Sequence, residues 1–179
     1  QLRSDNTSVE STQSNKQKTF TSDGYTLGTD AQINGSGGTY VAWNWKAGGS
    51  ASSNTNGTIT SSVSANAAAG FSIVSYSGNG SAGATVGHGL ASAPDLVIAK
   101  TLDTNGYNWP VYHSGLASTS HTLTLDLSSQ SGVETNKFNG TAPSSTVVTL
   151  GNHGTNLNGT NNQILYCFHN VDGYSKVGS

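Results

Sequence analysis

The sequence predicts an all-β protein made of two Ig-like or jelly-roll-like β-sandwich units that are related by an internal repeat. Three observations support this prediction. Short runs of β-branched and aromatic residues alternate with turn residues at a spacing of about ten. No window has the apolar spacing of an amphipathic helix without Gly, Asn or Ser interrupting it. Finally, two parts of the chain carry the same motifs in the same order.

The predicted strands are short and are bounded by turn residues. In chain order they are residues 24–28, 39–46, 58–64, 71–76, 95–101, 107–113, 121–127, 146–150, 163–169 and 174–177. Asn-Gly pairs, which suit the positive φ angles of tight turns, separate several of them. Many short strands with regular turn signals are typical of a sandwich.

The internal repeat is clearest where residues 40–45 (YVAWNW) align with residues 164–169 (ILYCFH). At the same spacing of 123 or 124 residues, Val9-Glu10 aligns with Val133-Glu134, Thr26-Leu27-Gly28 with Thr149-Leu150-Gly151, and Asn34-Gly35 with Asn158-Gly159. A shorter match, at a spacing of 103, aligns residues 70–74 (GFSIV) with residues 173–177 (GYSKV). A repeat of this kind defines a structural module.

The repeat divides the chain into three parts. Residues 1–50 are expected to form an incomplete β unit, the second part of the repeat module. Residues 51–69, rich in Gly, Ser and Asn, are expected to be a linker. Residues 70–179 are expected to form a complete β-sandwich module followed by the opening strand of a further module.

These boundaries leave strands without partners at both ends, and unpaired strand edges attract other strands. We therefore expect a neighbouring copy to supply a donor strand, with candidate inter-subunit strands around Leu2, Val9, Tyr174 and Val177. Head-to-tail contacts that do not close into a ring give a helical homopolymer. An alternative remains open, in which the chain is two modules of a longer tandem array and the strands are completed in cis.

Composition argues against several classes of partner. Charged residues make up 9% of the chain and the formal net charge is −2, so no basic cluster is present to bind nucleic acid. No run approaches the roughly 18 apolar residues of a membrane-spanning helix, so no membrane span is expected. The sequence begins at Gln1 and has no Met, so we expect removal of an export signal or upstream segment and a location outside the cell or on a virion surface.

No catalytic, cofactor-binding or metal site is expected. The five His residues lack the close spacing of metal ligands, and Glu10 and Glu134 occupy equivalent positions of the repeat, which favours a structural role. Cys167, the only cysteine, lies in an apolar run and is predicted to be a buried, inert thiol.

Aromatic residues and glycosylation motifs are the remaining surface signals. Trp43 and Trp45 lie two residues apart on a predicted strand, where core filling is the commoner use, although with Trp109 they could also form a platform for sugars. Possible N-glycosylation sites follow the Asn-x-Ser/Thr pattern and are Asn6, Asn34, Asn56, Asn79, Asn139 and Asn158.

Several motifs resemble a family of tandem β-rich domains of unknown function. They include residues 71–80 (FSIVSYSGNG), 94–100 (PDLVIAK), 107–113 (YNWPVYH) and 163–177 (QILYCFHNVDGYSKV). The resemblance implies a building block of large structural or tail-fibre-like proteins of aquatic phages and bacteria, with no catalytic residues to carry over.

Together these features predict a non-enzymatic structural subunit of an extracellular filament, pilus-like or appendage-like, that assembles with copies of itself by inter-subunit strand complementation. The alternative is a phage tail-fibre or adhesin domain that binds host surface glycans through exposed aromatic residues.

Overall fold

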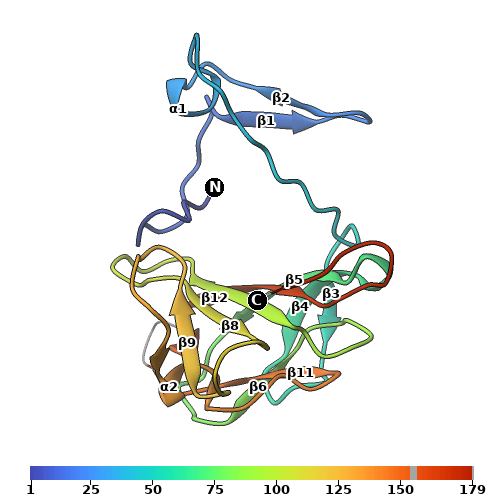
Figure 1. Ribbon diagram of the computed structural model, residues 1–179, viewed down its shortest axis with the longest axis vertical. Coiled ribbons are helices and arrows are strands. Elements are labelled where there is room, and N and C mark those ends of the chain that lie inside the picture. The colour runs from blue at the N-terminus through green and yellow to red at the C-terminus, as the bar shows by residue number, and fades with distance from the viewer. Residues whose placement is uncertain (154–156, 179) are drawn as a thin grey trace.

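The computed structural model of the chain describes residues 1–153 and 157–178, and most of its regular structure is antiparallel β (Figure 1). The strands are β1 (Gln17–Phe20), β2 (Tyr25–Leu27), β3 (Ser52–Asn54), β4 (Ser61–Asn66), β5 (Phe71–Ser77), β6 (Ala84–Gly87), β7 (Leu96–Thr101), β8 (Pro110–His113), β9 (His121–Thr124), β10 (Gly132–Val133), β11 (Val147–Leu150) and β12 (Asn162–Phe168). The described helices are short: α1 (Ala31–Asn34), η1 (Ala67–Ala69) and α2 (Thr135–Phe138). The all-β prediction is confirmed.

The largest sheet has eight strands in the order β10-β9-β8-β7-β12-β5-β4-β3. β12 lies in its middle and pairs antiparallel with β5 on one side and β7 on the other. Its Leu165 lies opposite Val74 and Ala99, and all three side chains are fully buried on the inner face of the sheet. A central strand of this kind must be apolar, because both of its neighbours and one face exclude water.

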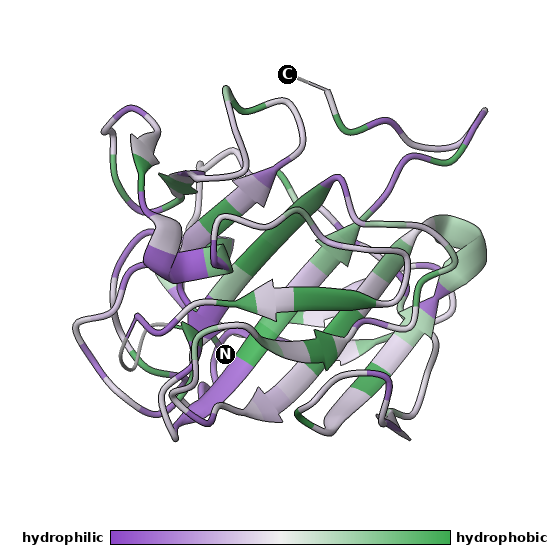
Figure 2. Cartoon of the chain, turned by 90° about the horizontal axis from the view of Figure 1, so that it is seen from below, coloured by the Kyte–Doolittle hydropathy of each residue, from purple (hydrophilic) through white to green (hydrophobic). Residues whose placement is uncertain are grey.

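The smaller β6–β11 sheet covers that inner face (Figure 1). Val86 lies opposite Val148, and both side chains pack into the core cluster with Val74 and Leu165. Figure 2 shows the apolar segments that run along the strands of this two-layer body. Burying such side chains contributes roughly 1.5–3 kcal/mol each, and this drives the two layers together.

The outer face of the large sheet is also apolar. One row across it contains Ile73, Tyr166 and Ile98, which lie opposite one another on β5, β12 and β7. These side chains are only half-buried. The alternation of β5, β7 and β12 therefore places hydrophobic side chains on both faces of the sheet.

The first part of the chain leaves the body and returns to it (Figure 1). We call residues 1–11 the N-terminal loop and residues 12–47 the arm. The arm contains the β1–β2 hairpin and α1, and all four residues of β1 are exposed. Within the arm only Lys16 and Gly28 are buried, so the hairpin has no hydrophobic core of its own.

Three secondary-structure predictions are wrong. The stretch 39–46 is not a strand, and neither is 174–177, where an isolated bridge between Val171 and Ser175 closes a turn instead. Residues 51–69, the predicted linker, contain β3 and β4, and β4 overlaps the predicted strand 58–64. β4 pairs with β5 because Ser61 and Val63 turn toward the core, so a Ser- and Asn-rich composition does not prevent strand formation here.

Candidate assembly surface

Residues 40–45 have the sequence pattern of a β-strand but lack the hydrogen bonds of one. Among the described residues, none of their backbone N–H groups donates to another backbone carbonyl. Val41 is 79% exposed and Trp43 is 76% exposed. The prediction that Trp43 and Trp45 fill a core is therefore wrong, because no second strand covers this segment. The segment is therefore apolar and has no backbone partner, which is the kind of segment to which another chain can add a strand.

Trp45 fixes the returning arm to the body. Its ring centroid lies 5.6 Å from that of Phe168 in an edge-to-face contact and 6.4 Å from that of Phe71. The indole of Trp43 stacks on that of Trp45 at 6.4 Å, farther from the sheet. Asn66 Nδ2 donates to Lys46 O at 3.1 Å and secures the next residue. The segment is therefore held at one end and open along the rest.

The C-terminal tail, residues 170–178, follows β12 and turns back on itself. Val171 N donates to Ser175 O, and Ser175 N donates to Val171 O, both at 2.9 Å. Gly173 occupies the left-handed region at φ 73°, as this turn requires. Tyr174, a predicted inter-subunit residue, is 70% exposed, and Val177 is half-buried.

The arm and the tail meet at a groove of about 650 Å³ on the outer face of the large sheet. Its floor contains Leu96, Ile98 and Phe168, and His113 lies on its wall. Asn44 and Trp45 line it from the arm, and residues 174–178 line it from the tail. Leu96, Ile98 and His113 were not among the predicted surface residues, although the unbroken apolar run of β7 is a signal that both of its faces are used.

The N-terminal loop is bound to the body rather than free to pair. Trp109 Nε1 donates to Arg3 O and Asn6 O, each at 3.1 Å, and Trp109 is buried. Val9 N donates to Asn105 Oδ1 at 3.1 Å. Leu2 and Val9 therefore lie in a loop of the single chain, and the inter-subunit strands expected there stay a prediction. Burial also removes Trp109 from any exposed sugar platform.

Two distant parts of the chain make the same backbone contacts. Gly28 N donates to Lys16 O at 2.6 Å, and Gly151 N donates to Lys137 O at 2.6 Å. A further pair of contacts matches: Asn34 Nδ2 donates to Gly28 O at 2.9 Å, and Asn158 Nδ2 donates to Gly151 O at 2.8 Å. A Cβ on Gly28 would meet Asn15 O at 2.1 Å, and one on Gly151 would meet Asn136 O at 2.0 Å, so both positions exclude any larger residue.

The possible glycosylation sites differ in access. Asn6 is half-buried, and Asn34, Asn56, Asn79 and Asn139 are exposed. Asn158 is fully buried, and its Nδ2 donates to Ser81 O and Gly151 O, each at 2.8 Å. Its amide nitrogen is not accessible in the folded chain, because it holds two loops of the body together.

Several titratable side chains of the body are buried. Cys167 is buried and free, as predicted, and burial raises the pKa of its thiol to about 12. His88 is also buried; its Nε2 lies 3.1 Å from Ser144 O, and its Nδ1 accepts from Leu90 N at 3.2 Å. Burial lowers the pKa of His88. Within the described ranges, no cluster of three or more His, Cys, Asp or Glu residues is arranged to hold a metal ion.

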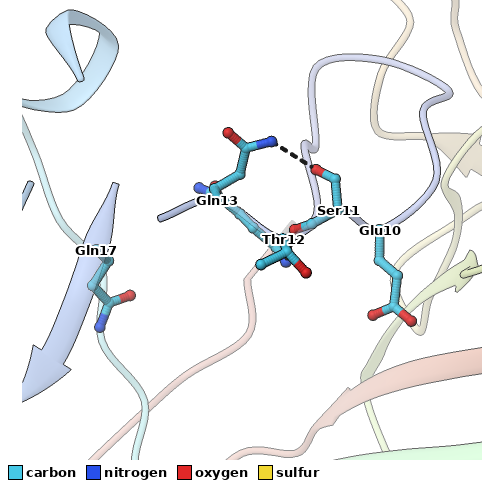
Figure 3. A pocket seen from close by; sticks show the side chains of 6 residues that line it. Glu10, Ser11, Thr12, Gln13 and Gln17 are labelled. Atoms are coloured by element: carbon cyan, nitrogen blue, oxygen red, sulfur yellow. Dashed lines mark hydrogen bonds between the residues drawn. The ribbon is translucent and has the colours of Figure 1, made fainter. Parts of the chain in front are cut away.

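A polar pocket of about 630 Å³ lies where the N-terminal loop meets the arm (Figure 3). Gln13 Nε2 donates to Ser11 Oγ at 3.0 Å, and the carboxylate of Glu10 points away from this pair. Gln17 faces the pocket from β1. Among the described residues that line it, Glu10 is the one carboxylate, whereas glycoside hydrolysis uses a pair of them.

Comparison with known proteins gives one family. Searches of curated proteins and of solved structures found no match. Among the described residues, no helix is both long and apolar enough to cross a membrane. One family model matches the whole chain, residues 1–179, and the chain therefore belongs to the DUF7483 family of domains of unknown function.

Proposed function

We propose that this chain is a non-enzymatic structural subunit that assembles head to tail with copies of itself into an extracellular filament, by strand complementation. The observation that carries the proposal is the exposed, unpaired segment 40–45, which has the sequence of a buried strand. Burial of Val41 and Trp43 by a partner would contribute roughly 1.5–3 kcal/mol of favourable free energy for each side chain.

The internal repeat forms part of this proposal. The matched contacts of Gly28 and Gly151, together with those of Asn34 and Asn158, support the view that residues 1–50 correspond to the second part of the module in residues 70–179. In the body, the stretch equivalent to 40–45 is β12, which has a strand on each side. Ig-like or jelly-roll-like units and a tail-fibre setting remain predictions of the sequence.

A location outside the cell or on a virion surface fits the surface composition. Several Asn-x-Ser/Thr sites, including Asn56 and Asn79, are exposed, and sugars there would keep a weakly charged filament soluble. The proposal does not require glycosylation, because assembly depends on the arm.

Sedimentation velocity over a range of protein concentrations, with electron microscopy of the same samples, tests the proposal. We expect species much larger than one chain, visible as filaments. The double variant Val41→Ser/Trp43→Ser should lose them, whereas Leu127→Ser, which changes an exposed leucine of the body, should retain them. A native chain that stays monomeric at every concentration would refute self-assembly.

A second candidate, binding of a host surface glycan, is favoured by the groove between Trp45, His113 and Tyr174. Exposed aromatic rings beside polar groups suit the stacking and hydrogen bonding of sugars. Glycan-array binding that is lost in Trp45→Ala and retained in Leu127→Ala, by a chain that forms no filaments, would favour this function over assembly.

A further inference from the structure

The pairing of β12 with β5 provides a template for the contact between copies. In that pair Leu165 lies opposite Val74, and Cys167 lies opposite Ser72, with all four side chains on the inner face. The strands run antiparallel. His169 N donates to Gly70 O at 2.9 Å at the end of the ladder.

Both strands of this template have a counterpart elsewhere in the chain. Residues 40–45 align with 164–169 of β12, and residues 173–177 align with 70–74 at the start of β5. Gly70 and Gly173, the aligned glycines, share a left-handed backbone, at φ 65° and φ 73°. Gly70 ends the short helix η1, and Gly173 lies within the turn that Val171 and Ser175 close.

We propose that residues 41–44 of one copy pair antiparallel with residues 174–177 of a second copy, in the register that β12 and β5 use within the body. This inference rests on the proposed function and specifies its contact. The expected opposite residues are Val41 with Val177, Ala42 with Lys176, Trp43 with Ser175, and Asn44 with Tyr174.

The side chains suit this register. Val41 and Val177 occupy the positions of Leu165 and Val74, so two apolar side chains meet on one face. On the same face, the large indole of Trp43 lies opposite the small Ser175, which leaves it room. The other face brings together Ala42, Asn44, Lys176 and Tyr174, which tolerate water. A shift by one residue would place Lys176 on the apolar face.

A second copy is the partner, because the chain's own tail does not pair with its arm. Asn44 and Tyr174 line one groove, but among the described residues no backbone hydrogen bond joins the two segments. The tail instead bonds to itself between Val171 and Ser175. Val41 and Trp43 face solvent, so that side of the arm is open to a strand from outside.

Disulfide trapping under mild oxidation tests the register. Two single variants, Val41→Cys and Val177→Cys, are mixed, one of them with a tag that makes their heterodimer distinguishable by mass. A disulfide needs Cβ atoms about 3.5–4.5 Å apart, which directly opposite residues approach. The matched control mixes Val41→Cys with Lys176→Cys, one residue out of register. Native Cys167 is buried, and crosslinking of the native chain through it gives the background level of dimer.

We expect the Val41→Cys and Val177→Cys mixture to give about tenfold more heterodimer than the control mixture, because a slip of one residue turns the thiol to the opposite face. The double variant Val41→Cys/Val177→Cys should give a ladder of multimers. A disulfide confined within single chains of the double variant would overturn the inference.

Sedimentation of the same samples distinguishes a wrong strand register from a failure of self-assembly. Equal trapping in both mixtures, or none, from chains that still form large species would overturn the register and leave the proposed function standing. Samples without large species and without trapping would overturn both.

Discussion

The indole of Trp45 packs edge-on against the ring of Phe168, with 5.6 Å between the ring centroids. This contact joins the returning arm to the central strand of the body. It also positions the open segment before it, because Trp43 stacks on the same indole. The arm is therefore anchored at its base and exposed along its length.

Replacing Trp45 by Ala should release the base of the arm without unfolding the body. Aromatic contacts of this kind contribute about 0.5–1.5 kcal/mol, so local opening should increase up to roughly tenfold. Limited proteolysis should cut the arm faster by that factor, while the midpoint of thermal unfolding changes little. The control is Trp43→Ala, which removes a ring that lies farther from the sheet; an equal acceleration there would contradict the anchoring role.

Substitutions at the two matched glycines should show whether the arm and the body unfold independently. Gly151→Ala places a Cβ 2.0 Å from Asn136 O, far inside the distance that a Cβ can tolerate, and should lower the free energy of unfolding by at least about 2 kcal/mol. Gly28→Ala makes the same clash at 2.1 Å from Asn15 O, but in the arm, so chemical denaturation of the body should be nearly unchanged.

Gly132→Ala is the control for this pair, because a Cβ there meets nothing within 4 Å. Equal destabilisation by Gly28→Ala and Gly151→Ala would mean that the arm and the body unfold as one unit.

Stability should fall as the solution becomes acidic, through His88. Burial lowers the pKa of the folded-state imidazole below the ordinary 6.5, so the unfolded chain binds the proton more tightly. The stabilising contribution is complete above pH 6.5 and is lost as pH falls below it, at up to about 1.4 kcal/mol per pH unit. His153, whose pKa burial also lowers, adds to the effect.

Urea denaturation of the native chain and of His88→Gln at several pH values measures this contribution. The variant, which keeps hydrogen-bonding capacity but cannot titrate, should show a shallower loss of stability in acid. Parallel curves for the two proteins would contradict the assignment to His88.

Cys167 should be unreactive until the body unfolds. With its pKa at about 12, the thiolate fraction at pH 8 is roughly a thousandfold below that of an exposed thiol, and the side chain is buried. Mass spectrometry after iodoacetamide treatment should detect labelling only in denaturant. Rapid labelling of the native chain would show that β12 opens readily.

The sequence predicts well those strands whose own side chains are mostly apolar. β5, β7 and β12 combine alternation with apolar residues on both faces, and the structure has them within one or two residues of the predicted bounds. β3 was not predicted, and β4 overlaps the predicted strand 58–64 only in part. Ser61 and Ser64 are polar, so pairing with neighbouring strands rather than hydrophobicity places them in β4.

The residues predicted to pair between copies lie in different surroundings in the single chain. Tyr174 and Val177 line the groove, whereas Leu2 does not, because Trp109 binds the N-terminal loop through contacts that are distant in sequence. The segment 40–45 has every local signal of a strand and is unpaired, because strand formation depends on a partner that local sequence does not reveal.

Hydrogen–deuterium exchange of the peptide that covers residues 39–46 measures whether this segment becomes a paired strand on assembly. We expect fast exchange of these backbone amides in dilute, dissociated chain and strong protection in the sedimenting fraction at high concentration, as for a paired strand. Equally fast exchange in both samples, or a chain that yields no sedimenting fraction, would contradict this expectation.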